Sequence, residues 1–374
     1  MSVTRIMKIH YLVKSFEGGG TGFAMIPVLQ MLREAGYQID ITACRPGDML
    51  SAQRFEAAGF PCHTLFHKPV NKAKIIWKFI TLLKKTGRPD IIMTSLTTGG
   101  FVGQIVGKLL GIPVISWKHS ANLKRTTART MHFSKLWIAD SPSVGDFVQN
   151  VMKIPPSKII VWPLFCCEVE RGVRKAWTGV EPLRIGSIGR LDKIKNYPLF
   201  LEGIALFRET YPQYANKVLV SILGEGPDRL NIEKKIRDKG LEKCVKLLGY
   251  SPDVYNYLNT LDLYAQPSEY EGMCMAAHEA LSTGLPLLAT PVGEMQSSLK
   301  NDVGFVLDGD IPWAICNALK DIFEKPALLE EKSQNALDYT HRYYSKAAFE
   351  KAGQEVLKRI GYLIFSEPSR KSGV

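Results

Sequence analysis

Apolar residues in this chain gather in short continuous runs that alternate with longer stretches in helical spacing. A helical stretch from about Phe23 to Ala35, ending at Gly36, separates the first two runs. Continuous apolar runs are typical of strands buried on both faces, and their alternation with helices predicts a parallel sheet. The first half carries six such runs: KIHYLV (8–13), QIDITAC (38–44), DIIMTS (90–95), PVISWKH (113–119), KLWIADS (135–141) and KIIVWP (158–163).

The alternation stops over Leu164 to Pro182, which has no clear period, and then resumes. The second set of runs is LRIGSIG (183–189), KVLVSILG (217–224), CVKLLGY (244–250), LDLYAQPS (261–268), LPLLATP (285–291) and GFVLD (304–308). We therefore predict an α/β protein of two Rossmann-like, doubly wound domains, with ligands outside the carboxyl ends of the strands and a cleft between the domains. The predicted division is 1–165, a linker 166–182, 183–345, and a helix and tail 346–374.

The last helix runs from about Lys346 to Leu363 and follows a complete second domain, so a return to the first domain is open to it. The tail SEPSRKSGV after it is predicted to be disordered.

Composition agrees with two ordinary globular domains. The chain has 374 residues, 45% hydrophobic and 22% charged. We find no stretch of about 18 apolar residues, and the first residues read as a strand, Lys8 to Val13, rather than a secretory signal. Seven scattered cysteines favour a reduced, cytoplasmic chain. The adjacent Cys166 and Cys167 lack a second pair, so we expect no metal site there.

The net charge of +12 is concentrated in one half of the chain. Residues 1–170 carry 21 Lys and Arg against 10 Asp and Glu, whereas the rest is nearly balanced. This asymmetry favours an anionic partner for the first half, namely a membrane surface, a nucleic acid or an acidic substrate. A solvated surface without such a partner is the alternative.

Three cations follow the first strand of the second half. Gly189 and Arg190 end LRIGSIGRL, and Lys193 and Lys195 come shortly after. Arg190 and Lys195 could hold a diphosphate, although a charged surface run explains the same residues.

Two glycine-rich loops lie between a strand and a helix. Gly224-Glu225-Gly226-Pro227 lacks the spacing of a dinucleotide fingerprint, and we expect a tight turn there. The run from Gly18 to Gly22 would let a ligand approach the backbone at a helix start, or would simply form a flexible turn.

Two carboxylates, Glu271 and Glu279, flank the helix that follows LDLYAQPS. Glu271 lies in the loop, and Glu279 lies near the second turn of a helix starting near Cys274. Both can reach the mouth of one cleft, where a carboxylate accepts hydrogen bonds from vicinal sugar hydroxyls. Ordinary acids near a helix start are the alternative.

The stretch PSEYEGMCMAAHEALSTGLPLLAT (267–290) resembles the signature of retaining glycosyltransferases of the family-4 type, with its two glutamates at the E-x7-E spacing. The resemblance extends in order through IGSIGRLDKIKNYPLFLEGIA, ILGEGPDRLNIEKKI, VKLLGYSPDVYNYLNTLDLYAQPS and VGFVLDGD. The first half matches in outline only, through its glycine-rich loop, RPDIIMTS and a histidine after a strand.

This resemblance implies the GT-B fold and a nucleotide-sugar donor held mainly by the second domain, with the acceptor on the first. By resemblance Arg190 and Lys195 hold the diphosphate, and Glu279 binds the donor ribose. Glu271 binds the sugar hydroxyls. The further contacts implied for the donor are Gly19, Gly20, Gly189, the backbone of Gly272, Met273, Cys274 and Met275, the base region at Tyr250 and Ser251, and His119 facing the sugar.

Two departures from the family pattern stand out. Cys274 replaces a common glycine, which puts the sugar contacts in doubt, and PLFCC replaces Pro-Asn-Gly after KIIVWP. The sequence of Asp308 to Asp310 invites a metal, but Asp310 reads more simply as a helix cap before Trp313. The architecture usually works without a bound metal, so we expect no metal or other cofactor. His278, which lies on the helix between the two glutamates, is expected to be a packing residue and not a catalytic one.

The sequence thus predicts a retaining, metal-independent hexosyltransferase of class EC 2.4. It would use a UDP- or GDP-sugar and a glycan or lipid-linked acceptor in bacterial polysaccharide or lipopolysaccharide synthesis. One alternative is an anionic-polymer or nucleic-acid binding protein, but the basic half lacks the interleaved aromatic residues that stack on bases. Another alternative is a glycosyltransferase-like scaffold that has lost its activity. The helical stretch Val70 to Arg88 has an apolar face and a lysine-rich flank. We therefore expect peripheral binding to the anionic inner face of the cytoplasmic membrane.

Overall fold

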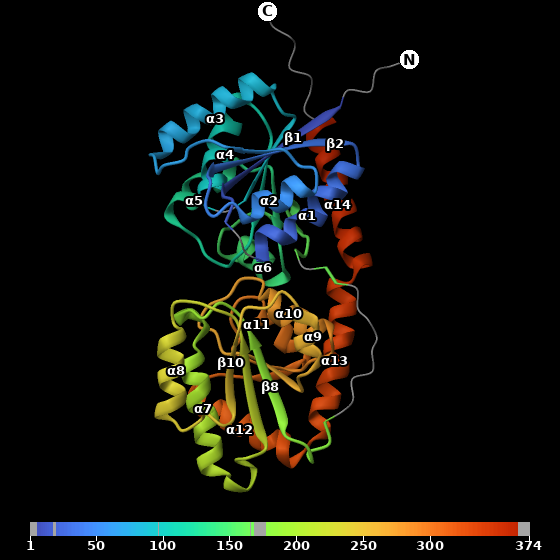
Figure 1. Cartoon of the computed structure of the whole chain (residues 1–374). Coiled ribbons are helices and arrows are strands. Elements are labelled where there is room, and N and C mark those ends of the chain that lie inside the picture. The colour runs from blue at the N-terminus through green and yellow to red at the C-terminus, as the bar shows by residue number, and fades with distance from the viewer. Residues whose placement is uncertain (1–5, 18–19, 96, 165, 168–176, 366–374) are drawn as a thin grey trace, which may run out of the picture. The chain divides into compact units, whose positions relative to one another are not determined.

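A computed structural model describes residues 6–17, 20–95, 97–164, 166–167 and 177–365. The chain divides into two compact units, one of residues 1–165 with 349–374 and one of residues 166–348. Figure 1 labels the elements of both units. Each unit is described by itself below.

The first unit is a parallel sheet in the order β3-β2-β1-β4-β5-β6-β7. Its strands are β1 (Met7–Ser15), β2 (Tyr37–Arg45), β3 (Cys62–Thr64), β4 (Ile91–Ser95), β5 (Val114–Lys118), β6 (Leu136–Ala139) and β7 (Ile159–Val161). The hydrophobic pattern predicted all of them except β3, because three residues without an apolar run give no signal.

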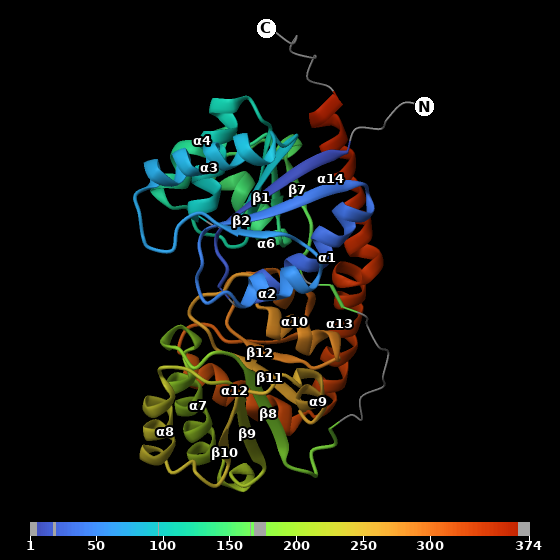
Figure 2. The ribbon, with the colours of Figure 1, turned by 45° about the horizontal axis from the view of Figure 1, so that its top comes forward.

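Helices cover both faces of this sheet, as continuous apolar strands require. The helices α3 (Lys72–Thr86) and α4 (Thr97–Leu110) bury Phe79, Leu83 and Val102 against Leu12 and Ile92. On the other face lie α1 (Gly20–Glu34) and α14 (Lys346–Phe365), where Gly353 approaches Met31 and Trp162 (Figure 2). The remaining helices are α2 (Leu50–Ala57), α5 (Arg125–Thr130), α6 (Pro142–Asn150) and the short 3-10 turns η1 (Met131–Phe133) and η2 (Pro156–Lys158).

The second unit repeats the plan with a parallel sheet in the order β10-β9-β8-β11-β12-β13. Its strands are β8 (Leu183–Ile188), β9 (Val218–Leu223), β10 (Val245–Gly249), β11 (Leu263–Gln266), β12 (Leu287–Ala289) and β13 (Gly304–Val306). All six coincide with predicted runs, which are one or two residues longer at the ends.

One face of the second sheet carries α7 (Tyr197–Thr210), α8 (Arg229–Asp238) and α12 (Ile311–Glu324), whose apolar sides form one core cluster with the strands. Figures 1 and 2 show α9 (Val254–Asn259), α10 (Met275–Ser282) and α13 (Ala327–Tyr344) on the other face. The short elements are α11 (Met295–Ser298), η3 (Lys193–Lys195), η4 (Pro212–Tyr214) and η5 (Leu299–Asn301).

The predicted linker 166–182 groups with the second unit. The Cys167 amide donates to the Tyr344 carbonyl, and Trp177 packs edge-on against Phe323. Residues 168–176 and the predicted disordered tail lie outside the described residues. From Phe349 on, α14 belongs to the first unit, so the helix does return to it.

Candidate active site

The carboxyl edge of the second sheet is built from two interlocked loops. A side chain added at Gly224, whose φ is +152°, would place its Cβ 1.9 Å from the Gly189 carbonyl oxygen. A Cβ at Gly226 would lie 2.3 Å from the Leu191 carbonyl oxygen, and the Leu191 amide donates to the Glu225 carbonyl. The glycines therefore serve the close approach of two backbones, which is more than the tight turn that the sequence predicted.

An ion pair joins the two loops that carry the predicted catalytic groups. Lys195, in η3 after β8, places Nζ 2.7 Å from Oε1 of Glu271, in the loop after β11. The side chains are 21% and 11% exposed. The backbone fixes the approach as well, because the Glu269 amide donates to the Ile194 carbonyl. Lys195, which is predicted to bind the diphosphate, and Glu271, which is predicted to bind the sugar, are thus direct neighbours.

Two buried polar side chains hold Glu271 from behind, and sequence reasoning missed both. Gln266 Nε2 and Ser268 Oγ each donate to the same Oε1, at 2.6 and 2.7 Å. Tyr264 supports Gln266 in turn, at 3.2 Å from its Oε1, and hydrogen-bonds the backbone of Ile188. A signal was present, because Gln266 and Ser268 are polar residues at the carboxyl end of an otherwise apolar strand.

The loop after Glu271 turns into α10 through a strained residue. Cys274 adopts the left-handed conformation, with φ at +54°, just before Met275 begins the helix. Its side chain is buried, and burial holds the pKa of the thiol well above its ordinary value. The thiol is therefore kept protonated and is a packing group, not a nucleophile.

Glu279 occupies the second turn of α10 in a largely desolvated position. Burial raises the pKa of Glu279 to about 7. Its charge also contributes to raising the pKa of Tyr255 on α9, so the two groups lie close together. Tyr250, which is exposed, and Ser251 follow the end of β10 at the same edge of the sheet.

The predicted residues of the second half therefore come together at one sheet edge. Arg190 is exposed in the loop after β8, next to the residues that position Lys195. Gly272, Met273 and Met275 form the turn into α10. The arrangement can receive an anion at the two cations and hydroxyl groups at the two carboxylates.

In the first unit, His119 follows β5 and lies against Asp140, which follows β6. His119 Nδ1 lies 3.4 Å from Oδ2 of Asp140, a distance that allows electrostatic contact although the pair does not meet hydrogen-bond geometry. Asp140 is 1% exposed. Asp140 is a third residue that sequence reasoning missed, and nothing in the spacing of His119 and Asp140 would have paired them.

Several buried polar atoms around this pair have no hydrogen-bond partner in the described structure. They are both ring nitrogens of His119, both carboxylate oxygens of Asp140, and the indole nitrogens of Trp117 and Trp162. Trp117 stacks on the His119 ring, with 6.2 Å between ring centroids, and also contacts Trp162. Buried polar groups in native folds usually bond to protein, water or a ligand, so these atoms are the unusual feature of this cluster.

Lys118 adds a cation beside the same carboxylate. Burial lowers the pKa of Lys118 to about 8, and the charge of Asp140 opposes that shift. Gly20 is the first residue of α1, whereas Gly19 lies outside the described residues.

Three further residues have structural contacts in the fold. His278 is fully buried, with Nδ1 3.1 Å from the Cys274 carbonyl oxygen, and its pKa is lowered to about 4 by burial. Asp310 caps α12 by accepting from the Trp313 amide, and Cys167 is a buried thiol near the Tyr344 carbonyl. In the described residues, no three His, Cys, Asp or Glu side chains are grouped to hold a metal ion.

Two family models match this chain. One, for "Glycosyl transferases group 1", matches residues 174–339, and one, for "Glycosyltransferase Family 4", matches residues 18–165. Together they span both units. The chain belongs to the family-4-type glycosyltransferases and has their GT-B fold.

One similar protein is the amylovoran biosynthesis glycosyltransferase AmsK of Erwinia amylovora, which is 22% identical over 79% of this chain and 86% of the relative. Another is the UDP-Gal:α-D-GlcNAc-diphosphoundecaprenol α-1,3-galactosyltransferase of Escherichia coli, 26% identical over 69% of this chain and 72% of the relative. The first is named as a glycosyltransferase and the second as a galactosyltransferase.

Solved structures agree on the fold. Anabaena HepE in complex with UDP superposes with a TM-score of 0.76 at 17% identity, over 95% of this chain and 100% of that one. The lipopolysaccharide outer core galactosyltransferase WaaB superposes with a TM-score of 0.74 at 16% identity, over 96% and 100% of the two chains. Each helix in the described part of the chain is too short or too polar to cross a bilayer.

Proposed function

We propose that this glycosyltransferase is a retaining enzyme that moves a sugar from a UDP- or GDP-sugar to a glycan or lipid-linked acceptor in bacterial polysaccharide or lipopolysaccharide synthesis. The observation that carries the proposal is the Lys195–Glu271 pair, held by Gln266 and Ser268 at the carboxyl edge of the second sheet. The names of the two relatives support the acceptor class, since one makes amylovoran and the other acts on a diphosphoundecaprenol-linked sugar.

In this proposal the second unit holds the donor. Arg190 and Lys195 bind the diphosphate, Glu271 with the turn from Gly272 to Met275 binds the sugar hydroxyls, and Glu279 binds the ribose. The base lies at Tyr250 and Ser251. When the bond from the anomeric carbon to the diphosphate breaks, its electron pair goes to the diphosphate oxygen, and the two cations stabilise that charge. The acceptor oxygen bonds to the anomeric carbon on the face from which the diphosphate leaves, which gives retention, and the hydroxyl proton passes to the departing diphosphate oxygen.

The first unit receives the acceptor, with Gly19 and Gly20 near the phosphate or the acceptor and His119 toward the sugar. Asp140 is a positioning residue for His119, because it is the buried charge beside Nδ1 and leaves Nε2 for a substrate hydroxyl. No metal is needed in the proposal, since two side-chain cations neutralise the diphosphate. Activity is therefore expected to persist in excess EDTA.

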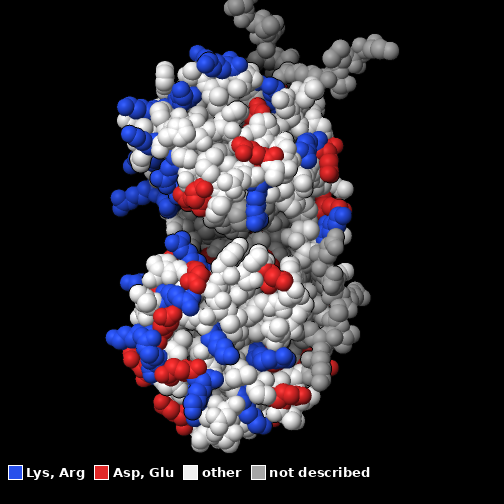
Figure 3. Space-filling view, in the orientation of Figure 1, with Lys and Arg blue, Asp and Glu red and all other residues white. Residues whose placement is uncertain are grey.

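The first unit is also proposed to rest on an anionic membrane surface. The helix α3 buries Ile75, Phe79 and Leu83, as its apolar face predicted, while Lys78, Lys84 and Lys85 are exposed. Trp77 adds an exposed aromatic ring to this flank. Figure 3 shows lysines and arginines gathered over the part of the first unit where α3 lies.

A transfer assay tests the proposed reaction. UDP- and GDP-sugars are offered with lipid-diphosphate-linked acceptors, and the product's anomeric configuration is read by NMR. We expect retention, with turnover about 10²-fold lower in a combined Arg190→Ala, Lys195→Ala variant. Inversion, or near-normal turnover in that variant, would overturn the proposed mechanism.

A further inference from the structure

A cavity lies in the first unit, at the edge of the sheet opposite to His119. Its volume is about 440 Å³, within the range of small-ligand sites. Lys135 and Leu136 at the start of β6 form one part, and Ser157 in η2 lies before β7. Asp140 lies five residues after Lys135, which at the rise per residue of a strand is a separation of roughly 16 Å. The cavity is therefore separate from the candidate active site of this unit.

One helical face supplies the other wall. The lining residues of α14 are Glu355, Lys358, Arg359, Tyr362 and Leu363, a spacing that places them on one side of a helix. The neighbouring side, with Val356 and Ile360, is buried in the core. Because the apolar side already anchors the helix, the polar side is not needed for packing and is available for a ligand.

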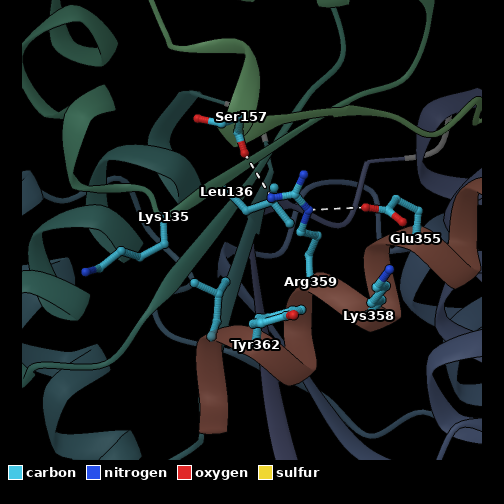
Figure 4. A pocket seen from close by; sticks show the side chains of 8 residues that line it. Lys135, Leu136, Ser157, Glu355, Lys358, Arg359 and Tyr362 are labelled. Atoms are coloured by element: carbon cyan, nitrogen blue, oxygen red, sulfur yellow. Dashed lines mark hydrogen bonds and ion pairs between the residues drawn. The ribbon is translucent and has the colours of Figure 1, made fainter. Parts of the chain in front are cut away.

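Arg359 is held in position before any ligand arrives. Its Nη1 donates to the Ser157 carbonyl at 3.2 Å and its Nε to Glu355 Oε1 at 3.2 Å (Figure 4). A guanidinium has five donors, so these two bonds orient the group without using it up. Lys358 and Arg359 are the cations of the helical wall and Glu355 is its one acid, so this wall carries an excess of positive charge that favours an anion. Lys135 lines the cavity from β6, with its ammonium group directed away from Arg359 (Figure 4).

The apolar part of the lining indicates more than a bare anion. Tyr362 is 62% exposed and offers a ring to the cavity, where Leu136 and Leu363 also contribute. An aromatic face beside fixed cations suits a sugar ring that carries an acidic group, because the ring covers the C–H face and the cations bind the acid. We propose that this cavity is a second carbohydrate site that binds an acidic sugar residue of a glycan chain.

This assignment rests on the cavity itself, and only the idea that the glycan is a substrate or product rests on the proposed function. Calorimetric titration with α-1,4-linked tetragalacturonate tests it, with neutral maltotetraose and inorganic phosphate as comparison ligands. We expect tetragalacturonate to bind and maltotetraose not to bind. Lys358→Glu and Tyr362→Ala should each weaken tetragalacturonate at least about tenfold, a change of about 1.4 kcal/mol. Both side chains are exposed, so the fold should tolerate the changes.

Lys351→Glu is the matched control, since it makes the same charge change on the exposed side of α14, two turns earlier and outside the cavity lining. Binding should also survive the combined Arg190→Ala, Lys195→Ala change, which separates this site from catalysis. The proposal is overturned if tetragalacturonate fails to bind, or if Lys351→Glu weakens it as much as Lys358→Glu. It is also overturned if Tyr362→Ala has no effect while phosphate competes with tetragalacturonate, because that result would leave a plain anion site.

Discussion

At the scale of single residues, Glu279 shows how burial prepares a group for its ligand. The fold raises the pKa of this carboxyl from its ordinary value to about 7, because the side chain loses water without gaining a cation. The charged form accepts hydrogen bonds at both oxygens, whereas the neutral form gives up one acceptor to a proton. A ribose that needs two acceptors should therefore favour the carboxylate.

Donor binding should accordingly tighten as the pH rises through about 7. Below that value Glu279 is increasingly protonated, and the affinity should fall more and more steeply, up to about tenfold for each pH unit. The test is titration with a nucleotide sugar, whose diphosphate diester keeps its charge over this range. Glu279→Gln should bind more weakly and without this pH dependence. An unchanged pH profile in Glu279→Gln would assign the dependence to another group.

Asp140 makes a second residue-scale prediction. Asp140→Asn removes a buried carboxylate that lacks a hydrogen-bond donor, but it also removes the charge beside Lys118, so thermal stability should stay close to that of the unaltered protein. Turnover should nevertheless fall by about tenfold or more, since His119 would lose the charge that orients its ring. Kinetics and thermal unfolding on the same variant separate the two effects. Full activity would show that Asp140 does not position His119, and lost activity with lost stability would indicate a merely structural role.

At the scale of elements, the sequence predicted the strands well and the contacts between loops poorly. Strands such as β4 and β8 follow from their own apolar runs, which any parallel sheet must bury. The support of Glu271 by Gln266 and Ser268 depends on side-chain orientation at the end of β11, which no residue spacing encodes. Gly19 lies outside the described residues, and the base position at Tyr250 stays a prediction.

The interlocked loops predict a large effect of a small change. Gly224→Ala would drive its Cβ into the Gly189 carbonyl, so the two loops must separate. Gly240→Ala is the matched control, because its φ is also positive, at +61°, yet nothing lies within 4 Å of the added Cβ. Urea unfolding should show Gly224→Ala at least about 2 kcal/mol less stable than Gly240→Ala. Equal losses would mean that the close approach to Gly189 adds no cost beyond that of a positive φ.

At the scale of the whole molecule, the charge is divided unevenly along the chain. Of the net +12, residues 1–170 hold an excess of 11 positive charges, from 21 basic and 10 acidic residues. At roughly 1 kcal/mol for each basic residue near an anionic surface, the exposed lysines of α3 are enough for reversible binding. The uneven charge therefore predicts where the protein is located, and this prediction is independent of the proposed reaction.

Vesicle sedimentation tests this location. The protein should bind anionic vesicles but not neutral ones. Salt at 0.5 M should release it, because the electrostatic screening length becomes shorter. Changing Lys78, Lys84 and Lys85 to glutamate should weaken binding strongly. The same change at three exposed lysines of the second unit, Lys234, Lys239 and Lys246, is the control and should weaken it less. Equal binding to both kinds of vesicle, or equal effects of both variants, would contradict the membrane proposal.

The central claim is that the second unit holds a nucleotide-sugar donor through Arg190, Lys195, Glu271 and Glu279. Thermal unfolding with added UDP or GDP tests it most directly. One of the two nucleotides, at 100 times its dissociation constant, should stabilise the protein by about 2.7 kcal/mol and so name the donor's base. Glu279→Ala should lose about 1–3 kcal/mol of nucleotide binding. If neither nucleotide shifts the midpoint at millimolar concentration, or if Glu279→Ala responds as the unaltered protein does, the assignment of the donor site is wrong.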